Sequence, residues 1–320
     1  MTRRSFIALL VTVYLTLLPG ACNWSNEIRN QEVRMAYPPI VASLPMFIAE
    51  DKKLFEREKL ELKKTQFANS NDMMNALVAD QVDLLPAVSL IPIIHLEIQY
   101  PGRVRLFSHS RMRPTNAFDS LIVKENSPIK NLTDLENKKV GIFPGTSATN
   151  MLNAFLKKKG VNTQQISFIQ LAPPAQLSSL ESGAIDALFT YEPVTTIATK
   201  KGGYRSLFGS VYADLLNPCP IGASVISRNF ERKNPETAAK AIKIIDEGVL
   251  FMRERPDESK KLLSRFTEMS PEISSSINVV DVTLSHENDV ANLQQFIDLL
   301  YEVGEIKEKI DARRLLDPTR

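Results

Sequence analysis

The chain has 320 residues, of which 43% are hydrophobic and 24% charged, a composition that is ordinary for a globular protein and a length that allows two domains. Lysine and arginine total 39 against 37 acidic residues, and no basic run occurs, so the charge gives no indication of nucleic-acid binding.

The first 21 residues are predicted to be a signal peptide. Arg3 and Arg4 are followed by an uncharged apolar run that is too short to span a bilayer as a mature helix. Small residues directly before Cys22 resemble the signal-peptidase site of bacterial lipoproteins, which makes Cys22 the predicted lipidation site and 22–31 a tether. An uncleaved anchor helix and a plain secretory signal are the alternatives, and all three export the protein.

Export places the protein in the bacterial periplasm or on the outer face of the cytoplasmic membrane. Without residues 1–21 the chain has 37 basic and 37 acidic residues. The chain has two cysteines, so a lipidated Cys22 leaves Cys219 without an intramolecular disulfide partner.

The first half of the chain alternates strands and helices. Residues 33–37 predict a strand, 46–55 an amphipathic helix and 60–66 a second strand. Asn69 and Ser70 are candidate caps of the next helix. Residues 84–89 then pass from a strand into another helix, and 104–108 predict a further strand.

The second half repeats this layout around residues 140–160. Val140 to Phe143 predicts a buried strand, the chain turns after it, and Thr146 or Ser147 can cap a helix that ends at Gly160. The free N–H groups of such a helix end favour an oxygen-rich or anionic ligand. The alternative is a junction that only connects two elements.

Both halves also contain a common phrase, at 77–83 and at 180–186: Leu, four residues, a β-branched residue and Asp. Repeated strand–helix alternation predicts two α/β lobes with parallel sheets. Ligands in such sheets lie beyond the carboxyl ends of the strands, so facing lobes would line one cleft.

Two segments predict crossings between the lobes, a strand over 118–124 and a return strand over 219–227. The expected layout is therefore lobe 1 (32–124), lobe 2 (125–218), and a C-terminal part (219–320) whose helices pack on lobe 1.

The sequence disfavours catalysis and metal binding. His95, His109 and His286 are far apart and show no metal-ligand spacing. No nucleophile elbow, Walker loop or dinucleotide fingerprint is present, and neither a cofactor nor a metal is expected.

Taken together, these residues resemble the periplasmic solute-binding proteins of ABC importers in the nitrate, sulfonate and taurine group, which includes the thiamine-pyrimidine binders. The phrases that carry the resemblance lie at 44–50, 73–83, 127–135, 139–146, 180–186 and 191–193. It implies a type II periplasmic-binding-protein fold with two lobes, two crossover strands and ligand capture by hinge closure. The chain departs from the pattern at 69–71, where many relatives have a glycine-rich turn, and at Tyr191, where tryptophan is common.

The resemblance also implies a set of ligand-binding residues. Tyr191 would offer a flat wall, and Glu192 would either accept from a ligand amino group or cap the helix that starts at Pro193. Arg111 and Arg113 are candidate charges for an anion, with solvated side chains as the alternative. The full set is Ser43, Leu44, Asn69, Ser70, Ala87, Ser89, Thr146, Ser147, Ala148, Tyr191 and Glu192.

The function that the resemblance implies is a lipid-anchored, monomeric receptor that captures a small polar or anionic organic solute and delivers it to an ABC permease. An enzyme on the same fold, such as a pyrimidine synthase, is an alternative, although the iron-cysteine cluster of those enzymes is absent. An exported ligand-sensing module is the third.

Overall fold

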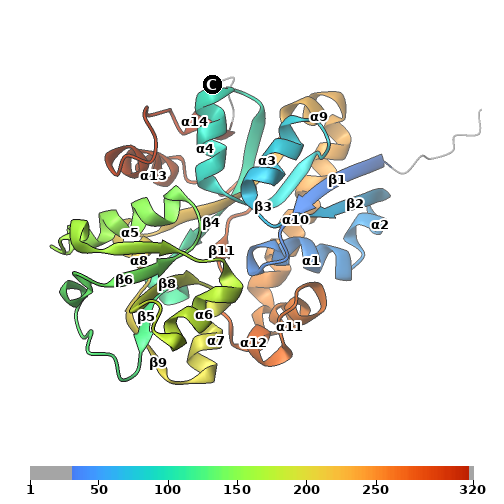
Figure 1. Cartoon of the computed structure of the whole chain (residues 1–320). Helices are drawn as coiled ribbons and strands as arrows, with labels where there is room; N and C mark the ends of the chain where they lie inside the picture. The colour runs from blue at the N-terminus through green and yellow to red at the C-terminus, as the bar shows by residue number, and fades with distance from the viewer. Residues whose placement is uncertain (1–30, 317–320) are drawn as a thin grey trace, which may run out of the picture. The chain divides into compact units, whose positions relative to one another are not determined.

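The computed structural model describes residues 31–316. The predicted signal peptide, Cys22 and the tether up to Asn30 lie outside the described residues. The described chain contains two mixed β-sheets, each covered by helices (Figure 1). We call each sheet with its covering helices a lobe. Within residues 31–316, no helix is both long and apolar enough to cross a membrane.

Lobe 1 contains a six-stranded sheet in the order β11-β4-β10-β3-β1-β2. β1 is parallel to β2 and β3, whereas β10 is antiparallel to both of its neighbours. The strands are β1 (Gln31–Tyr37), β2 (Leu60–Gln66), β3 (Leu84–Ser89), β4 (Val104–Met112), β10 (Cys219–Ser227) and β11 (Asp281–Val282).

Lobe 2 contains a five-stranded sheet in the order β7-β6-β8-β5-β9. β6 is parallel to β7 and β8, and β5 is antiparallel to β8 and β9. The strands are β5 (Asp119–Lys124), β6 (Lys139–Ile142), β7 (Ser167–Gln170), β8 (Ala187–Tyr191) and β9 (Tyr204–Gly209).

The repeated layout predicted from the sequence is present in the sheets. The order β3-β1-β2 in lobe 1 matches β8-β6-β7 in lobe 2. The Asp that ends each common phrase makes the same contacts: Asp83 Oδ2 accepts from Arg34 N at 2.8 Å, and Asp186 Oδ2 accepts from Lys139 N at 2.8 Å. The backbone N–H groups of these aspartates donate back to the carbonyls of Arg34 and Lys139. The phrase therefore joins the third strand of each unit to the first.

Helices cover both faces of each sheet, and their apolar sides form three clusters. One cluster packs helices α1, α2, α9, α10 and α11, the first group given below, on one face of the lobe 1 sheet. A second is continuous between the lobes, and a third packs α6 and α7 on lobe 2. The first group is α1 (Leu44–Asp51), α2 (Leu54–Arg57), α9 (Arg228–Lys233), α10 (Pro235–Glu254) and α11 (Pro256–Phe266). The remaining helices are α3 (Ser70–Val78), α4 (Leu90–Gln99), α5 (Thr146–Lys158), α6 (Pro173–Ser182), α7 (Val194–Lys201), α8 (Val211–Leu215), α12 (Pro271–Ser276), α13 (Val290–Glu302) and α14 (Arg313–Leu316).

Some element boundaries differ from the sequence-based expectation. The helix expected over 46–55 is two helices, α1 and α2, because Lys53 adopts the left-handed conformation with φ of 56°. The helix α5 begins after Gly145, whose φ is 118°, and neither Thr146 nor Ser147 caps it. The predicted hydroxyl cap is therefore wrong, since glycine alone accepts that backbone conformation easily.

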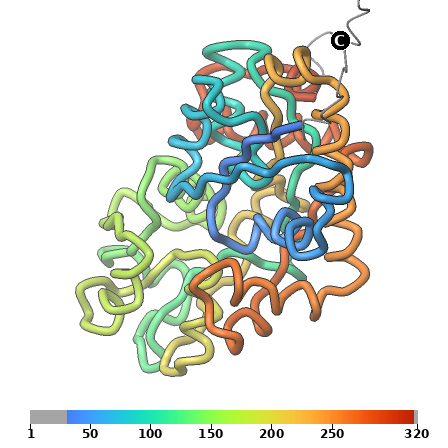
Figure 2. The backbone as a smooth tube through the Cα atoms, turned by 90° about the vertical axis from the view of Figure 1, so that its right-hand side faces the viewer, coloured from blue at the N-terminus to red at the C-terminus, as the bar shows by residue number. Residues whose placement is uncertain are grey.

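The chain crosses between the sheets twice. The first crossing runs from β4 to β5, so β5 belongs to the second sheet and the lobe 1 boundary moves from residue 124 to before Asp119. The return runs from β9 through α8 to β10, where the thiol of Cys219 is fully buried. Figure 2, turned by 90°, shows α10 and α11, in orange, on the side of the molecule that carries α1 and α2.

Candidate functional site

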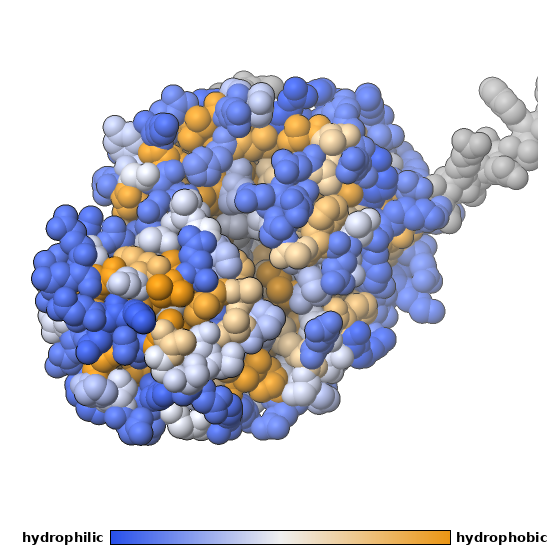
Figure 3. Space-filling model, viewed as in Figure 1, coloured by the Kyte–Doolittle hydropathy of each residue, from blue (hydrophilic) through white to orange (hydrophobic). Residues whose placement is uncertain are grey.

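A pocket of about 260 Å³ lies where the two lobes meet. Lobe 2 supplies most of its lining, and the segment after α12 closes it from the other side. Asn278 Nδ2 in that segment donates to the carbonyl of Ala117 at 3.1 Å, and Lys200 on α7 lies 3.5 Å from Glu272 on α12. The lining residues are Ala117, Asp119, Ser120, Glu192, Thr195, Thr196, Thr199, Lys200, Gly209, Ser276 and Asn278. Figure 3 shows that the face drawn in Figure 1 is hollowed between the lobes.

The chemistry of this lining suits a small polar solute. Its hydroxyls, an amide, an amine and two carboxyl groups can each donate or accept hydrogen bonds, and the lining contains neither histidine nor cysteine.

Asp119 is the more buried of the two acids, with 1% of its surface exposed. Its Oδ2 accepts from the backbone N–H of Tyr212 at 3.3 Å, and its Oδ1 has no hydrogen-bond partner among the described residues. Burial raises the pKa of Asp119 to about 7, against the weaker opposing effect of the backbone hydrogen bonds. This carboxyl group therefore titrates near neutral pH.

Glu192 lies at the start of α7 and is 8% exposed. Its carboxylate accepts from Thr196 N at 3.1 Å and from Thr196 Oγ1 at 3.0 Å. Burial raises the pKa of Glu192, and the hydrogen bonds from Thr195 and Thr196 act in the opposite direction. Glu192 was expected either to accept from a ligand amino group or to cap α7. The capping contacts are present, and Glu192 also lines the pocket.

The predicted ligand residues of lobe 1 lie at the starts of α1, α3 and α4. Ser43 and Leu44 are fully buried, and Ser43 Oγ donates to the carbonyl of Pro38 at 2.7 Å. These two side chains therefore belong to the protein interior in this structure, and any ligand contact at that position would involve the backbone.

Two of the other lobe 1 residues are brought together. Ser70 Oγ accepts from Ser89 N at 3.1 Å, which joins the start of α3 to the end of β3. Asn69 caps α3 by accepting from Asp72 N at 2.9 Å, as expected from the sequence. Ala87 is 5% exposed and lies within β3.

In lobe 2, the predicted residues at the start of α5 have different environments. Thr146 is exposed and Ala148 is 4% exposed. Ser147 is half-buried, and its Oγ donates to the carboxylate of Glu305 at 2.8 Å. Glu305 was not among the predicted residues.

Tyr191 lies at the centre of an aromatic cluster. Its ring centroid lies 6.1 Å from that of Phe118 and 5.8 Å from that of Phe143, and its hydroxyl group lies 3.0 Å from that of Tyr212. Phe143 is 37% exposed, so the cluster reaches the surface directly before the turn into α5. The flat wall expected from Tyr191 is therefore shared with two phenylalanines that directly adjoin strands β5 and β6.

The two candidate arginines are already paired. Arg111 Nη2 lies 2.9 Å from Asp281 Oδ2, and Arg113 Nε lies 3.9 Å from the same oxygen. The Arg113 side chain is 42% exposed, which leaves it the more accessible of the two.

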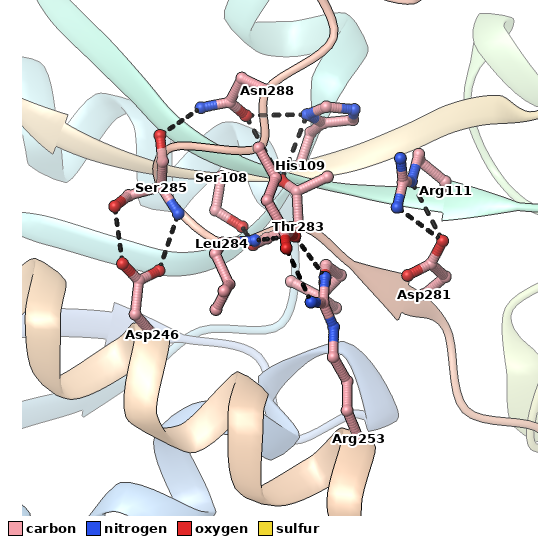
Figure 4. Close-up of polar contacts among 12 residues, drawn as sticks. Ser108, His109, Arg111, Asp246, Arg253, Asp281, Thr283, Leu284, Ser285 and Asn288 are labelled. Carbon is pink, nitrogen blue, oxygen red and sulfur yellow. Dashed lines mark hydrogen bonds and ion pairs between the residues drawn. The ribbon is translucent and has the colours of Figure 1, made fainter.

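In lobe 1, strand β4 is fixed to the segment after β11 (Figure 4). His109 Nδ1 lies 2.9 Å from Asn288 Oδ1, and Ser108 Oγ donates to the carbonyl of Thr283 at 2.6 Å. Ser285 N donates to Asp246 Oδ1 on α10 at 2.8 Å. Burial lowers the pKa of His109, although the hydrogen bond with Asn288 acts to raise it. Over residues 31–316, no group of three or more His, Cys, Asp and Glu residues could hold a metal ion.

Two facing α/β sheets, two crossing connections and a pocket at their boundary define a type II periplasmic-binding-protein fold, as expected. The crystal structure of the periplasmic aliphatic sulphonate binding protein SsuA from Escherichia coli superposes with a TM-score of 0.74 at 22% identity, covering 89% of this chain and 92% of that one. A desulfurization enzyme, DSZB, superposes with a TM-score of 0.68 at 14% identity, covering 90% and 96%.

The chain belongs to the NMT1/THI5-like family, whose model matches residues 41–259. Among curated proteins, the "Putative aliphatic sulfonates-binding protein" of Bacillus subtilis (strain 168) is 23% identical over 330 residues, covering 99% of this chain and 95% of the relative. The family resemblance read from the sequence is thereby confirmed.

Proposed function

We propose that this protein is the extracytoplasmic solute-binding component of an ABC importer, anchored through Cys22, and that it holds a small polar or anionic organic solute between its lobes until a permease accepts it. The observation that carries this proposal is the polar pocket at the lobe boundary, to which both lobes contribute. The family membership and the sulfonate-binding relatives support it, and make sulfonates the first solutes to test.

The test is binding by the purified full chain. We expect a one-to-one complex in titration calorimetry with one of a panel of sulfonates, nitrate, pyrimidines and aromatic acids. A ligand at about 100 times its Kd adds about 2.7 kcal/mol to the free energy of unfolding, and therefore raises Tm. A panel without any thermal shift, together with no small molecule in the mass spectrum of the native protein, would contradict the proposal.

A matched pair of asparagine variants locates the site. Asn278→Ala removes the pocket amide that contacts Ala117, and is expected to weaken solute binding about tenfold, the equivalent of one lost hydrogen bond. Asn229→Ala removes an exposed amide that donates to Asp80 outside the pocket, and should leave the Kd unchanged. Equal Kd values for both variants would place the solute elsewhere.

One observation favours the enzymatic alternative: Asp119 lines the pocket and titrates near neutral pH, as a general acid or base does. The fold shared with a desulfurization enzyme is compatible with it. Turnover of a bound sulfonate or sulfinate that is lost in Asp119→Asn would establish this function, and binding without turnover would exclude it for those compounds.

A further inference from the structure

Lys200 is the basic residue in the lining of the pocket between the lobes, which also contains the carboxyl groups of Asp119 and Glu192. It lies in the last turn of α7, where the negative end of the helix dipole favours a cation, and Lys201 follows it directly. The Lys200 side chain is 41% exposed and ends in a flexible four-carbon stem, so its ammonium group is accessible to a solute in the pocket.

The partner of this ammonium group comes from the other side of the pocket. Glu272 Oε1 lies 3.5 Å from Lys200 Nζ. Glu272 is in the first turn of α12, which lies in the chain between α11 and β11 of lobe 1 and contacts both α11 and α7. Glu272 itself is not among the described residues that line the pocket. The pair therefore joins the two lobes beside the pocket.

This ion pair is easily exchanged. At 3.5 Å its two atoms are further apart than the distance of about 2.8 Å in a good charge-assisted hydrogen bond. The Glu272 side chain is 72% exposed, so water competes for it. Exposed ion pairs of this kind change an equilibrium constant by at most about fivefold. An oxyanion in the pocket therefore needs little free energy to take the place of Glu272 at Lys200.

The two acids of the lining leave room for an anion at Lys200. Glu192 lies eight residues before Lys200, which separates the two positions by about 12 Å along the helix. The Glu192 carboxylate accepts from Thr196 N and Oγ1, and burial raises its pKa. Asp119 accepts from Tyr212 N, and burial raises its pKa to about 7. Both pKa shifts favour the uncharged acids, which lowers the repulsion that an anion meets in the pocket.

Lys200 is also the strongest hydrogen-bond donor that the lining offers to an oxyanion. Hydroxyl groups on both sides of the pocket give their protons to the backbone: Thr199 Oγ1 donates to the carbonyl of Thr195 at 3.0 Å, and Ser276 Oγ donates to the carbonyl of Glu272 at 3.0 Å. The ammonium group of Lys200 has three protons and a positive charge. It is therefore the group in the lining that suits an oxyanion best.

We propose that Lys200 is the residue of this pocket that binds the anionic group of the solute, and that the Glu272 carboxylate occupies Lys200 until the solute displaces it. This inference rests on the proposed function, because it assigns the solute-binding cation of that same site. Glu272 does not touch the solute. It lowers the affinity of the pocket for anions by competing for Lys200.

The test measures Kd by titration calorimetry on the full chain, at one low ionic strength because salt screens exposed charges. The probes are ethanesulfonate, nitrate and benzoate, and the variants are compared with the anion that the wild-type protein binds most tightly. Lys200→Gln is expected to weaken binding at least about tenfold, the equivalent of one lost charge-assisted hydrogen bond. Glu272→Gln is expected to tighten binding about two- to fivefold, because the competitor for Lys200 is removed.

The neighbouring pair of Lys201 and Glu181 is the matched control. Lys201 Nζ lies 2.8 Å from Glu181 Oε2, and neither residue is among the described residues that line this pocket. Lys201→Gln and Glu181→Gln change the net charge as the two test variants do, and each should keep the wild-type Kd. All four side chains are at least 41% exposed, so the variants are expected to fold as the wild-type protein does.

A double variant shows whether Glu272 acts through Lys200. When Glu272→Gln is combined with Lys200→Gln, the gain in affinity from Glu272→Gln should be absent. A gain that persists in the double variant would overturn the competition between Glu272 and the solute.

The remaining outcomes separate this inference from the proposed function. An equal Kd in Lys200→Gln and Lys201→Gln, or no gain in Glu272→Gln beyond that in Glu181→Gln, overturns the assignment while solute binding stands. Binding of a pyrimidine and of none of the three anions also overturns it, because the pocket then does not select an anion. A wild-type protein that binds no member of the wider panel contradicts the proposed function itself, and this inference with it.

Discussion

The two lobes have the same backbone plan and present different chemistry at their helix ends. In both, the third strand of the unit is joined to the first by an aspartate that accepts from a backbone N–H at 2.8 Å. The helix starts of lobe 1 offer the hydroxyl of Ser70, whereas those of lobe 2 have Glu305 and Glu192 beside them. The comparison teaches that the repeated phrase fixes backbone geometry, and that single residues outside it decide which polar groups each lobe presents.

The sharpest difference between the lobes is expected in their response to pH, through Asp119 of lobe 2. Its pKa is about 7 in the folded protein and near 3.8 when unfolded, so the folded state keeps a proton that the unfolded state releases. The stability from this group is complete below about pH 4 and is lost as pH rises through 7. Relative to Asp119→Asn, the wild-type free energy of unfolding should fall by up to about 4 kcal/mol between pH 4 and pH 8.

Urea unfolding of both proteins at several pH values measures this difference. His109, whose pKa is lowered by burial, titrates in both proteins and cancels in the comparison. Parallel pH profiles for the two proteins would show that Asp119 does not titrate in this range.

The next largest difference between the lobes is expected in the stability lost when a closely packed glycine is replaced by alanine. A Cβ added at Gly248 of α10 would overlap the carbonyl oxygen of Pro45 and lie 2.9 Å from its carbonyl carbon, so two helices of lobe 1 would have to move apart. A Cβ at Gly141 of lobe 2 would lie 2.5 Å from Ile185 Cδ1, the end of a flexible side chain. We expect Gly248→Ala to cost about 3 kcal/mol and Gly141→Ala about 1 kcal/mol.

The urea midpoints of these two variants, at an unchanged slope, provide the measurement. Equal losses of stability in the two variants would contradict this prediction. They would mean that moving α1 away from α10 costs no more free energy than turning the Ile185 side chain.

The smallest difference in stability between the lobes is expected at the two aspartates that end the common phrase, Asp83 and Asp186. Asp83 is 3% exposed and also accepts from Arg34 Nε at 3.0 Å and Nη2 at 2.6 Å, whereas Asp186 is exposed and holds one backbone N–H. Asp83→Ala should cost about 2 kcal/mol, discounted because Arg34 is partly exposed, and Asp186→Ala about 1 kcal/mol. A larger loss for Asp186→Ala in thermal unfolding would contradict this order.

Much of the fold is predictable from the sequence because its signals are local. The strand and helix order and the phrases ending at Asp83 and Asp186 depend on spacing within about ten residues, and the duplication is visible because the same local pattern occurs twice. The cap role of Glu192 was among the predicted alternatives for the same reason, since its partner Thr196 is four residues away.

The chemistry of the site is less predictable because its partners are distant. Ser147 was predicted as a cap or ligand residue, but its hydroxyl contacts Glu305, which is 158 residues further along the chain. The contact of Asn278 with Ala117 spans 161 residues. Phe118 and Phe143 could have been found locally, because each is an aromatic residue next to a strand that ends at the cleft.

The burial of Cys219 in the return strand makes its thiol a reporter of local opening around β10. The chain has two cysteines, and this thiol is fully buried, with a pKa raised well above its ordinary value. Alkylating reagents react with exposed thiolates, so modification at this position requires β10 to separate from its neighbours. The rate of labelling, with and without solute, therefore counts how often this separation occurs.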